Sequence, residues 1–306
     1  MGLKHQNNTS SNAGQKPIFV VKENDAGQRL DNFLLKHCKN ANKSSCYKLI
    51  RKGQIRINGK RVKPLQKIAA GDQVRVPPFL FFVEPTKVVV PENLQQQLLK
   101  EIIFEDADYL VLNKPPGLPC HAGTGHPFGV IEIIHAEQGF AEVQLAHRLD
   151  KDTSGCLLLA KNRVALLAFQ DALKLQQVEK TYLAILIGQL TEPLVVNEPL
   201  DTEHRINGIR HVIVSQTGSP AQTQFQPLNH QSECSLVQCD IASGRTHQIR
   251  VHAKHIGHPV LGDRFYGTQA PELTRALYLH AQKLQFKAYS FVAPVPVDFE
   301  QVVTTR

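Results

Sequence analysis

Seven short apolar segments between residues 102 and 286 constrain the fold more than any other feature of this sequence. Segments of this length, rich in aliphatic and aromatic residues and separated by polar turns, are typical of β-strands. The predicted strands are Ile102–Glu105, Tyr109–Asn113, Cys156–Ala160, Thr181–Ile187, Ala221–Phe225, Ser235–Ile241 and Tyr278–Phe286.

Two helices interrupt these strands. The first is expected from Arg163 to Leu175 with Asn162 as its N-cap, and the second from Thr246 as N-cap to Ile256. Because helices and strands follow one another without regular β-α-β alternation, we expect an α+β fold with a mainly antiparallel sheet.

Charge divides the chain into parts. The net charge is +8 overall, whereas residues 17–80 alone contain fourteen Lys or Arg against four Asp or Glu, a net charge of +10. Residues 1–16 add +2, so the remaining 226 residues carry 8 − 10 − 2 = −4. Positive charge concentrated in a small module favours a polyanionic partner such as RNA over a merely solvated basic face.

The basic module has a recognisable order of elements. Leu30, Phe33 and Leu34 share one face of a predicted helix, with Asp31 and Lys36 pointing away. A second helix is expected to bury its apolar face and to end at a glycine before a β-hairpin.

The second helix and the hairpin have local signals. Ser44 or Ser45 is the expected N-cap, and Tyr47 and Ile50 the expected buried residues. The pair Asn58 and Gly59 predicts a type I′ turn. This pattern resembles the S4 domain, a small RNA-binding fold. The expected phosphate-binding residues are Lys48, Arg51, Lys52, Arg56, Lys60, Arg61 and Lys63.

These features predict four parts. They are a disordered tail at 1–16, the S4-like domain at 17–80, a proline-containing linker at 81–94 and a catalytic domain at 95–306.

Composition and motifs argue against several classes of protein. No apolar run reaches the roughly 18–20 residues needed to span a bilayer, and the N-terminus does not resemble a secretory signal, so a cytoplasmic protein without membrane contact is expected.

The six cysteines form no Cys-x-x-Cys pair and are expected to be buried thiols. His252, His255 and His258 are too poorly matched in direction to predict a metal site. Gly123, Gly125 and Gly129 lack dinucleotide-binding spacing and are expected to belong to a flexible connection rather than to open a helix.

The segment from His147 to Gly155 is densely polar and precedes a buried strand, a position where catalytic groups often lie. It contains two acidic residues, Asp150 and Asp152. A polar turn would explain both by capping the backbone, and the residues alone do not distinguish the two.

A second polar segment runs from Gly244 to His252. If Thr246 caps the helix, His247, Arg250 and Lys254 lie along one face, where Arg250 could hold a carboxylate. A solvated basic helix, or one that only contacts phosphates, would have the same pattern.

The segment from His147 to Gly155 is similar to the signature of RluA-type pseudouridine synthases. Further segments resemble the family's motifs, in the same order, along residues 95–290. The S4-like module precedes them, as it does in many members of the family. These segments are Val111–Gly117, Lys180–Tyr182, Gly244–Arg250, Gly257–Gly267 and Leu277–Ala281.

The resemblance implies a role for particular residues. Asp150 matches the catalytic aspartate, Arg148 an arginine that holds the target nucleotide out of its helix, and Tyr182 the aromatic residue that packs against the base. Arg250 matches the basic partner of the carboxylate, and Leu279 an apolar residue of the pocket. Only the resemblance selects Asp150 over Asp152.

The implied reaction isomerises uridine to pseudouridine and requires no cofactor, metal ion or ATP. The carboxylate acts as a nucleophile or as a base, and the sequence leaves both open. The S4-like module favours ribosomal RNA of the large subunit (23S) as substrate, and a monomer is expected.

Alternatives are a synthase for tRNA or other rRNA and a non-catalytic ribosome-assembly factor. An aspartic protease would need a second Asp-Thr-Ser-Gly loop, and a glycosidase would need carboxylates facing each other.

Overall fold

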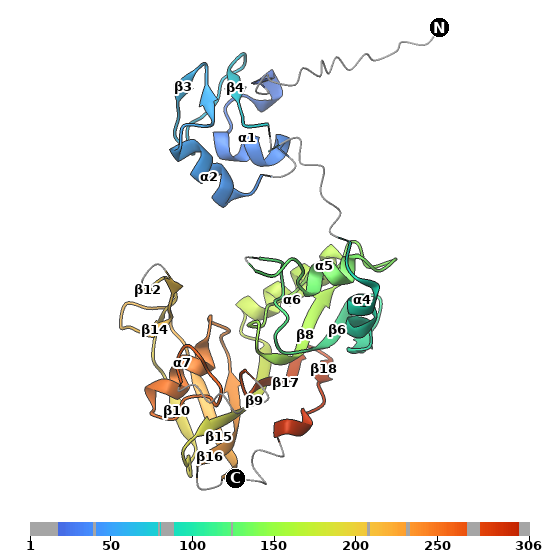
Figure 1. Ribbon diagram of the computed structural model, residues 1–306, viewed down its shortest axis with the longest axis vertical. Coiled ribbons are helices and arrows are strands. Elements are labelled where there is room, and N and C mark those ends of the chain that lie inside the picture. Colours follow the sequence, from blue (N-terminus) through green and yellow to red (C-terminus); the bar gives the residue numbers. More distant parts are fainter. Residues whose placement is uncertain are drawn as a thin grey trace. The chain divides into compact units, whose positions relative to one another are not determined.

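The computed structural model describes residues 18–38, 41–78, 80, 89–123, 125–206, 209–230, 233–267 and 276–299. The chain divides into two compact units, Met1–Val88 and Val89–Arg306 (Figure 1). The expected disordered tail, 1–16, and residues 81–88 of the expected linker lie outside the described residues. Residues 89–94, also expected in the linker, belong to the second unit, where a helix begins at Glu92.

In its described residues, the first unit has the α-helices α1 and α2, the short 3-10 helix η1 and a small antiparallel sheet with the strand order β1-β4-β2-β3. Its elements are β1 (Ile18–Val20), the 3-10 helix η1 (Glu23–Asp25), α1 (Leu30–His37), α2 (Lys43–Arg51), β2 (Arg56–Ile57), β3 (Lys60–Arg61) and β4 (Gln73–Arg75). Asn58 and Gly59, between β2 and β3, both have positive φ, 49° and 76°, as a type I′ turn requires. The predicted hairpin turn is confirmed.

Helix α1 buries Leu30, Phe33 and Leu34 as predicted, but the expectation that Asp31 points away is wrong. Asp31 is fully buried and accepts hydrogen bonds from Arg29 Nη2 at 2.6 Å and from the Tyr47 hydroxyl at 3.1 Å. A buried carboxylate is tolerated here because charged and neutral donors both reach it.

Helix α2 is capped by Asn42, not by Ser44 or Ser45. The Asn42 side chain accepts from Ser45 N at 2.8 Å, and Ser45 Oγ accepts from Asn42 N at 3.2 Å, which forms a reciprocal capping box. Tyr47, expected to be buried, is only half-buried, with its hydroxyl directed inward to the buried Asp31.

The second unit is built on one mixed, ten-stranded sheet. Its main strand order is β10-β15-β16-β9-β17-β8-β6-β5, with β18 paired to β17 and β7 to β8. All seven predicted strands are present, one of them, Ile102–Glu105, with the predicted ends and six with shifted ends. Among the described strands of this sheet, every pairing is antiparallel except that of β17 with β8. The strands are β5 (Ile102–Glu105), β6 (Tyr109–Lys114), β7 (Gln144–Leu145), β8 (Ser154–Ala160), β9 (Val178–Ile187), β10 (Leu194–Val196), β15 (Thr223–His230), β16 (Cys234–Ile241), β17 (Leu279–Phe286) and β18 (Tyr289–Val292).

Two small ribbons complete the strands of this unit. One pairs β11 (Leu200–Asp201) with β14 (Ile213–Val214), and the other pairs β12 (Arg205–Ile206) with β13 (Ile209–Arg210). The predicted α+β class with a mainly antiparallel sheet is confirmed.

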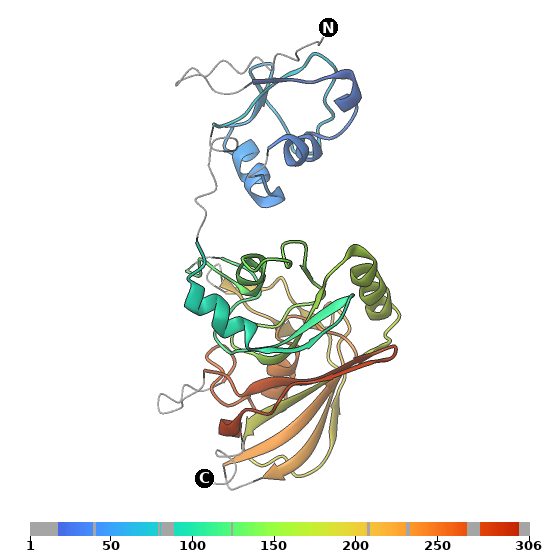
Figure 2. The ribbon, with the colours of Figure 1, turned by 90° about the vertical axis from the view of Figure 1, so that its right-hand side faces the viewer.

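Helices cover both faces of the sheet (Figure 2). They are α4 (Glu92–Leu99), α5 (Val130–His135), α6 (Arg163–Lys174) and α7 (Gln248–His255). Side chains of α4, α5 and α7 pack with Leu157 and Leu159 of β8, whereas those of α6 pack with Cys156 and Leu158. Successive residues of β8 therefore serve two cores, as the alternation of side chains along a strand requires.

Helix α6 and its N-cap are as predicted, since Asn162 accepts from Ala165 N at 2.8 Å. Helices α4 and α5 were not predicted, and Gly129 opens α5 as its N-cap, contrary to expectation. A side chain at Gly129 would overlap the backbone of His121, so the glycine lets the loop at 121 pass directly over the helix start.

Candidate active site

The middle of the sheet positions the candidate residues. Asp150 lies in the loop between β7 and β8, Tyr182 on β9 and Leu279 on β17, and β8, β17 and β9 are neighbouring strands. Residues that lie far apart in the sequence therefore meet at one place on the sheet.

The loop that carries Asp150 is fixed by two contacts. The ammonium group of Lys114, fully buried, donates to the carbonyl oxygens of Pro115, Leu118 and Lys151 at 2.8–2.9 Å. Burial lowers the pKa of Lys114 to about 8. Gly155, with φ of 106°, lets the chain pass against the Ala281 carbonyl of β17, where a Cβ would overlap it. The carboxylate is thus presented from a rigid support.

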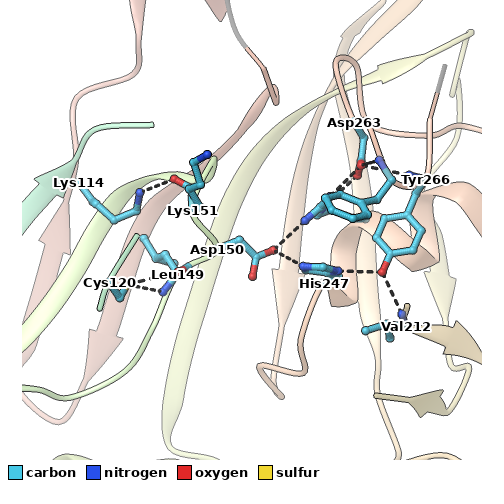
Figure 3. A network of polar contacts seen from close by, with 11 residues as sticks. Lys114, Cys120, Leu149, Asp150, Lys151, Val212, His247, Asp263 and Tyr266 are labelled. Carbon is cyan, nitrogen blue, oxygen red and sulfur yellow. Dashed lines mark hydrogen bonds and ion pairs between the residues drawn. The ribbon is translucent and has the colours of Figure 1, made fainter. Parts of the chain in front are cut away.

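Asp150 lies at the centre of a polar network (Figure 3). Its Oδ2 accepts a hydrogen bond from Arg250 Nη1 at 3.2 Å and lies 3.7 Å from His247 Nε2. The Asp150 side chain is 28% exposed, against 7% for Arg250. The carboxylate is consequently held from one side and open on another, as a group that must reach a substrate has to be.

Arg250 is itself fixed by Asp263 through two hydrogen bonds, Nε to Oδ2 at 2.7 Å and Nη2 to Oδ1 at 2.8 Å. Its guanidinium also lies over the ring of Tyr266, 5.1 Å from the centroid. Burial alone would lower the pKa of Arg250, but the hydrogen bonds and charge of Asp263 raise it above its ordinary value. Burial would likewise raise the pKa of Asp263, yet the hydrogen bonds from Arg250 hold it low. Both groups therefore stay charged.

His247 is the second neighbour of Asp150, and its contacts escaped the sequence analysis. It has a left-handed conformation, φ 54°, and is the N-cap of α7, so the prediction that Thr246 caps this helix is wrong. Its Nδ1 lies 2.8 Å from the Tyr266 hydroxyl, whose oxygen accepts from Val212 N at 3.1 Å (Figure 3). Burial lowers the pKa of His247. In the neutral ring, a Tyr266 O–H that donates to Nδ1 leaves the proton on Nε2, the nitrogen facing Asp150.

All five candidate catalytic residues line one cavity: Arg148, Asp150, Tyr182, Arg250 and Leu279. Tyr182 and Leu279 come from adjacent strands, and Tyr182 pairs with Ala281 in the register. Burial raises the pKa of Tyr182 above its ordinary value, so its hydroxyl stays protonated. The structure thus brings together residues that span positions 148–279 of the sequence.

The seven candidate RNA-binding residues lie in the first unit, on the C-terminal half of α2 and on the hairpin that follows. The end of α2 and the hairpin lie close together where the Arg61 side chain approaches Gly53, since a Cβ at Gly53 would lie 3.0 Å from Arg61 Nε. Arg56 donates to the carbonyl oxygens of Gly53 and Gly59. Within the described part of the chain, none of the seven forms an ion pair with a carboxylate, so their charges remain available.

The remaining histidines and cysteines have structural places. All six cysteines are buried, as predicted. His252 is buried and lies within 2.9 Å of Thr223 Oγ1 and of the Glu198 carbonyl oxygen. In the described ranges, no group of three or more His, Cys, Asp or Glu side chains is arranged to hold a metal ion. Nor does any described helix have the length and apolar character needed to cross a membrane.

Two family models match the chain. Residues 28–74 match the S4 domain, inside the first unit, and residues 108–255 match the RNA pseudouridylate synthase model, inside the second.

Curated relatives match along nearly the whole chain. The ribosomal large subunit pseudouridine synthase C of Escherichia coli strain K12 is 41% identical over 280 residues, which cover 88% of each chain. The protein of the same name from Vibrio cholerae is 40% identical over 307 residues, covering 95% of this chain and 96% of that protein.

Solved structures agree on the fold of the second unit. Human RNA pseudouridylate synthase domain containing 4 superposes with a TM-score of 0.56 at 26% identity, covering 68% of this chain and 93% of that one. Human RNA pseudouridylate synthase domain containing 1, at 23% identity and a TM-score of 0.53, shares the fold.

Proposed function

The chain belongs to the RNA pseudouridylate synthase family, and we propose on this basis that it converts uridines in ribosomal RNA of the large subunit to pseudouridine, with Asp150 as the catalytic carboxylate. The observation that carries the proposal is the cavity in which Arg148, Tyr182, Arg250 and Leu279 surround this one carboxylate. Relatives at 40–41% identity, named for the large ribosomal subunit, support the substrate.

The reaction needs little beyond a positioned carboxylate. The N1–C1′ bond of uridine breaks, the base turns and C5 bonds to C1′. The C5 proton then leaves and N1 takes up a proton, so that the product is an isomer of the substrate. Asp150 either attacks C1′ as a nucleophile or removes a sugar proton. Arg250, locked by Asp263, keeps the carboxylate aimed into the cavity.

The other residues of the cavity act on the nucleotide. The target base must leave its stack, which costs a few kcal/mol. Tyr182 packs against the extruded base, Leu279 lines the apolar side of the cavity, and Arg148, which is exposed, fills the place that the base leaves. In this division of work the S4 domain contributes phosphate contacts, which place the enzyme on the RNA without reading its sequence.

The protein acts as a monomer in the cytoplasm under this proposal. One chain supplies all five residues of the cavity, so a second copy is not required. Light scattering of the protein with and without RNA tests the first point, and cell fractionation tests the second.

The decisive experiment measures tritium release from RNA labelled at uridine C5, with transcripts of 23S rRNA, 16S rRNA and tRNA as substrates. We expect release from 23S rRNA, and Asp150→Asn should reduce its rate by about 10⁴-fold or more, because the variant keeps the shape but loses the charge of the reacting group. Asp152→Asn is the matched control, since Asp152 lies in the same loop but does not line the cavity. It should retain most of the activity.

The alternatives give different results. Release from tRNA in place of 23S rRNA would keep the reaction and overturn the substrate. Binding without release from any RNA, including partly assembled ribosomal particles, would favour an assembly factor. An active Asp150→Asn variant would refute the role of Asp150.

A further inference from the structure

A second cavity, of about 730 Å³, adjoins the first and shares Arg148, Asp150 and Tyr182 with it. Its lining contains a single carboxylate, that of Asp150, against five basic side chains: Arg148, Lys151, Lys174, Lys180 and Arg245. A concave surface with this excess of positive charge attracts a polyanion into the site.

Lys180 differs from the other four basic residues because it is buried. Only 8% of it is exposed, and it lies two residues before Tyr182 on β9, so both side chains emerge on the same face of the strand. Lys174, by contrast, is exposed and forms an ion pair with Asp171 at 2.8 Å. The Lys180 ammonium group therefore lies deep in the cavity, beside the residue expected to hold the base.

The Lys180 ammonium group lacks an ion-pair partner in the part of the chain that the structure describes. Among the described residues, no hydrogen bond or ion pair engages it, whereas buried Lys114 has three carbonyl partners. Burial lowers the pKa of Lys180 to about 8, and its positive charge in turn lowers the pKa of His147. The ammonium group is partly desolvated at the wall of the cavity, and an anion that enters the cavity would supply an ion-pair partner for it.

Space for such an anion lies next to the ammonium group. Gly244, in the loop between β16 and α7, faces it so closely that a Cβ there would lie 3.3 Å from Lys180 Nζ. A side chain at position 244 would crowd the ammonium group, and the cavity that both residues line supplies the space for an anion.

We propose that Lys180 binds a backbone phosphate of the RNA beside the target nucleotide, so that the extruded nucleotide is held by its phosphate as well as by its base. An ammonium group is a compact charge that suits a single phosphate, and every nucleotide supplies one at a fixed distance from its ribose. This assignment rests on the proposed function, since it takes RNA as the ligand of the cavity.

The test compares Lys180→Met with wild type in binding to a short RNA hairpin with uridines in its loop. A second hairpin has neutral methylphosphonates in place of the loop phosphates. For the natural hairpin, Lys180→Met should weaken binding by about 10-fold or more and reduce the slope of log K against log salt by about 0.7. For the neutral hairpin, wild type and variant should bind alike, because the partner of Lys180 is gone.

Two further variants separate binding from structure. Lys180→Arg keeps the charge and should restore much of the affinity. Lys100→Met removes the same charge from the exposed end of α4, outside the cavity, and should leave binding unchanged. The melting temperature of Lys180→Met should not fall, because a neutral side chain of similar length is easier to bury.

Three results would overturn the assignment. The first is an unchanged affinity of Lys180→Met for the natural hairpin, and the second is an equal loss of affinity for both hairpins. The third is a fall in kcat with an altered pH profile at unchanged affinity, which would make Lys180 a proton-transfer group. Since binding is the readout, a failure of the proposed function would appear separately, as absent tritium release by wild type.

Discussion

The position of the Asp150 carboxylate depends on a series of charged residues that hold one another by hydrogen bonds. Arg250 donates to Asp150 with one nitrogen and to Asp263 with the other two, and Asp263 also accepts from the backbone N–H groups of Phe265 and Tyr266 at 2.9 and 3.1 Å. Each group of this chain is held by more than one partner, which restricts its motion. A catalytic group positioned in this way loses little entropy when the substrate binds.

His147 makes the stability of the second unit dependent on pH. Its Nε2 accepts a hydrogen bond from Leu158 N at 3.1 Å, and burial lowers its pKa from 6.5 to about 4. Between these two pH values the unfolded chain binds the proton more tightly than the folded chain. The contribution to stability is therefore complete above pH 6.5 and is lost as the pH falls towards 4.

We expect His147→Gln to remove this dependence. From pH 7 to pH 5 the free energy of unfolding of wild type should fall by about 2 kcal/mol more than that of the variant. Chemical denaturation followed by circular dichroism at the two pH values measures the difference. Equal losses in both proteins would show that His147 titrates normally in the fold.

At the scale of elements, the active site depends on how closely β8 and β17 approach each other. This is the parallel pairing of the sheet, and it contains only the pairs His280 with Ser154 and Ala281 with Gly155. The loop of Asp150 ends where this pairing begins. A change in the spacing of the two strands would therefore move Asp150 relative to Leu279.

Gly155→Ala tests this dependence. Its Cβ would overlap the carbonyl group of Ala281, and φ of 106° is unfavourable for alanine, so we expect a loss of about 2–4 kcal/mol in stability and a large loss of activity. Gly117→Ala is the matched control, because Gly117 also has positive φ, 82°, but an added Cβ would meet no atom within 4 Å. That variant should lose only about 1 kcal/mol. Similar losses for both in thermal unfolding would rule out the close approach as the cause.

At the scale of the whole molecule, the two units differ in charge. Residues 17–80 carry a net charge of +10, whereas residues 81–306 carry −4, with five of their basic side chains gathered around one cavity. Each unit has its own hydrophobic core, so the basic surface of the first can change without disturbing the chemistry of the second.

Neutralising Arg51, Lys52 and Arg61 to Gln should therefore separate binding from chemistry. We expect weaker binding to 23S rRNA and a salt slope reduced by about 2–3, with kcat at saturating RNA nearly unchanged. The control neutralises Lys100, Lys161 and Lys287 of the second unit, and should leave the salt slope nearly as in wild type. Filter binding at several salt concentrations and tritium release measure the two effects. A fall in kcat with an unchanged slope would contradict this division.

The sequence by itself determined the features that neighbouring residues encode. Short apolar segments between polar turns predicted the strands, Asn162 predicted the start of α6, and Asn58 with Gly59 predicted the hairpin turn. Motifs in a fixed order along the chain predicted the family and pointed to Asp150. Short-range signals suffice for these features because backbone conformation and side-chain periodicity are set within a few residues.

Only the tertiary structure decided which groups meet. The family resemblance already paired Asp150 with Arg250, 100 residues away, but no pattern in the sequence indicates that Asp263 holds Arg250 or that His247 faces the carboxylate. The burial of Asp31 and of Lys180 was equally hidden, because both residues have the sequence pattern of ordinary surface charges. The physical reason is that desolvation and charge pairing depend on every group within a few ångströms, and folding brings those groups from distant parts of the chain.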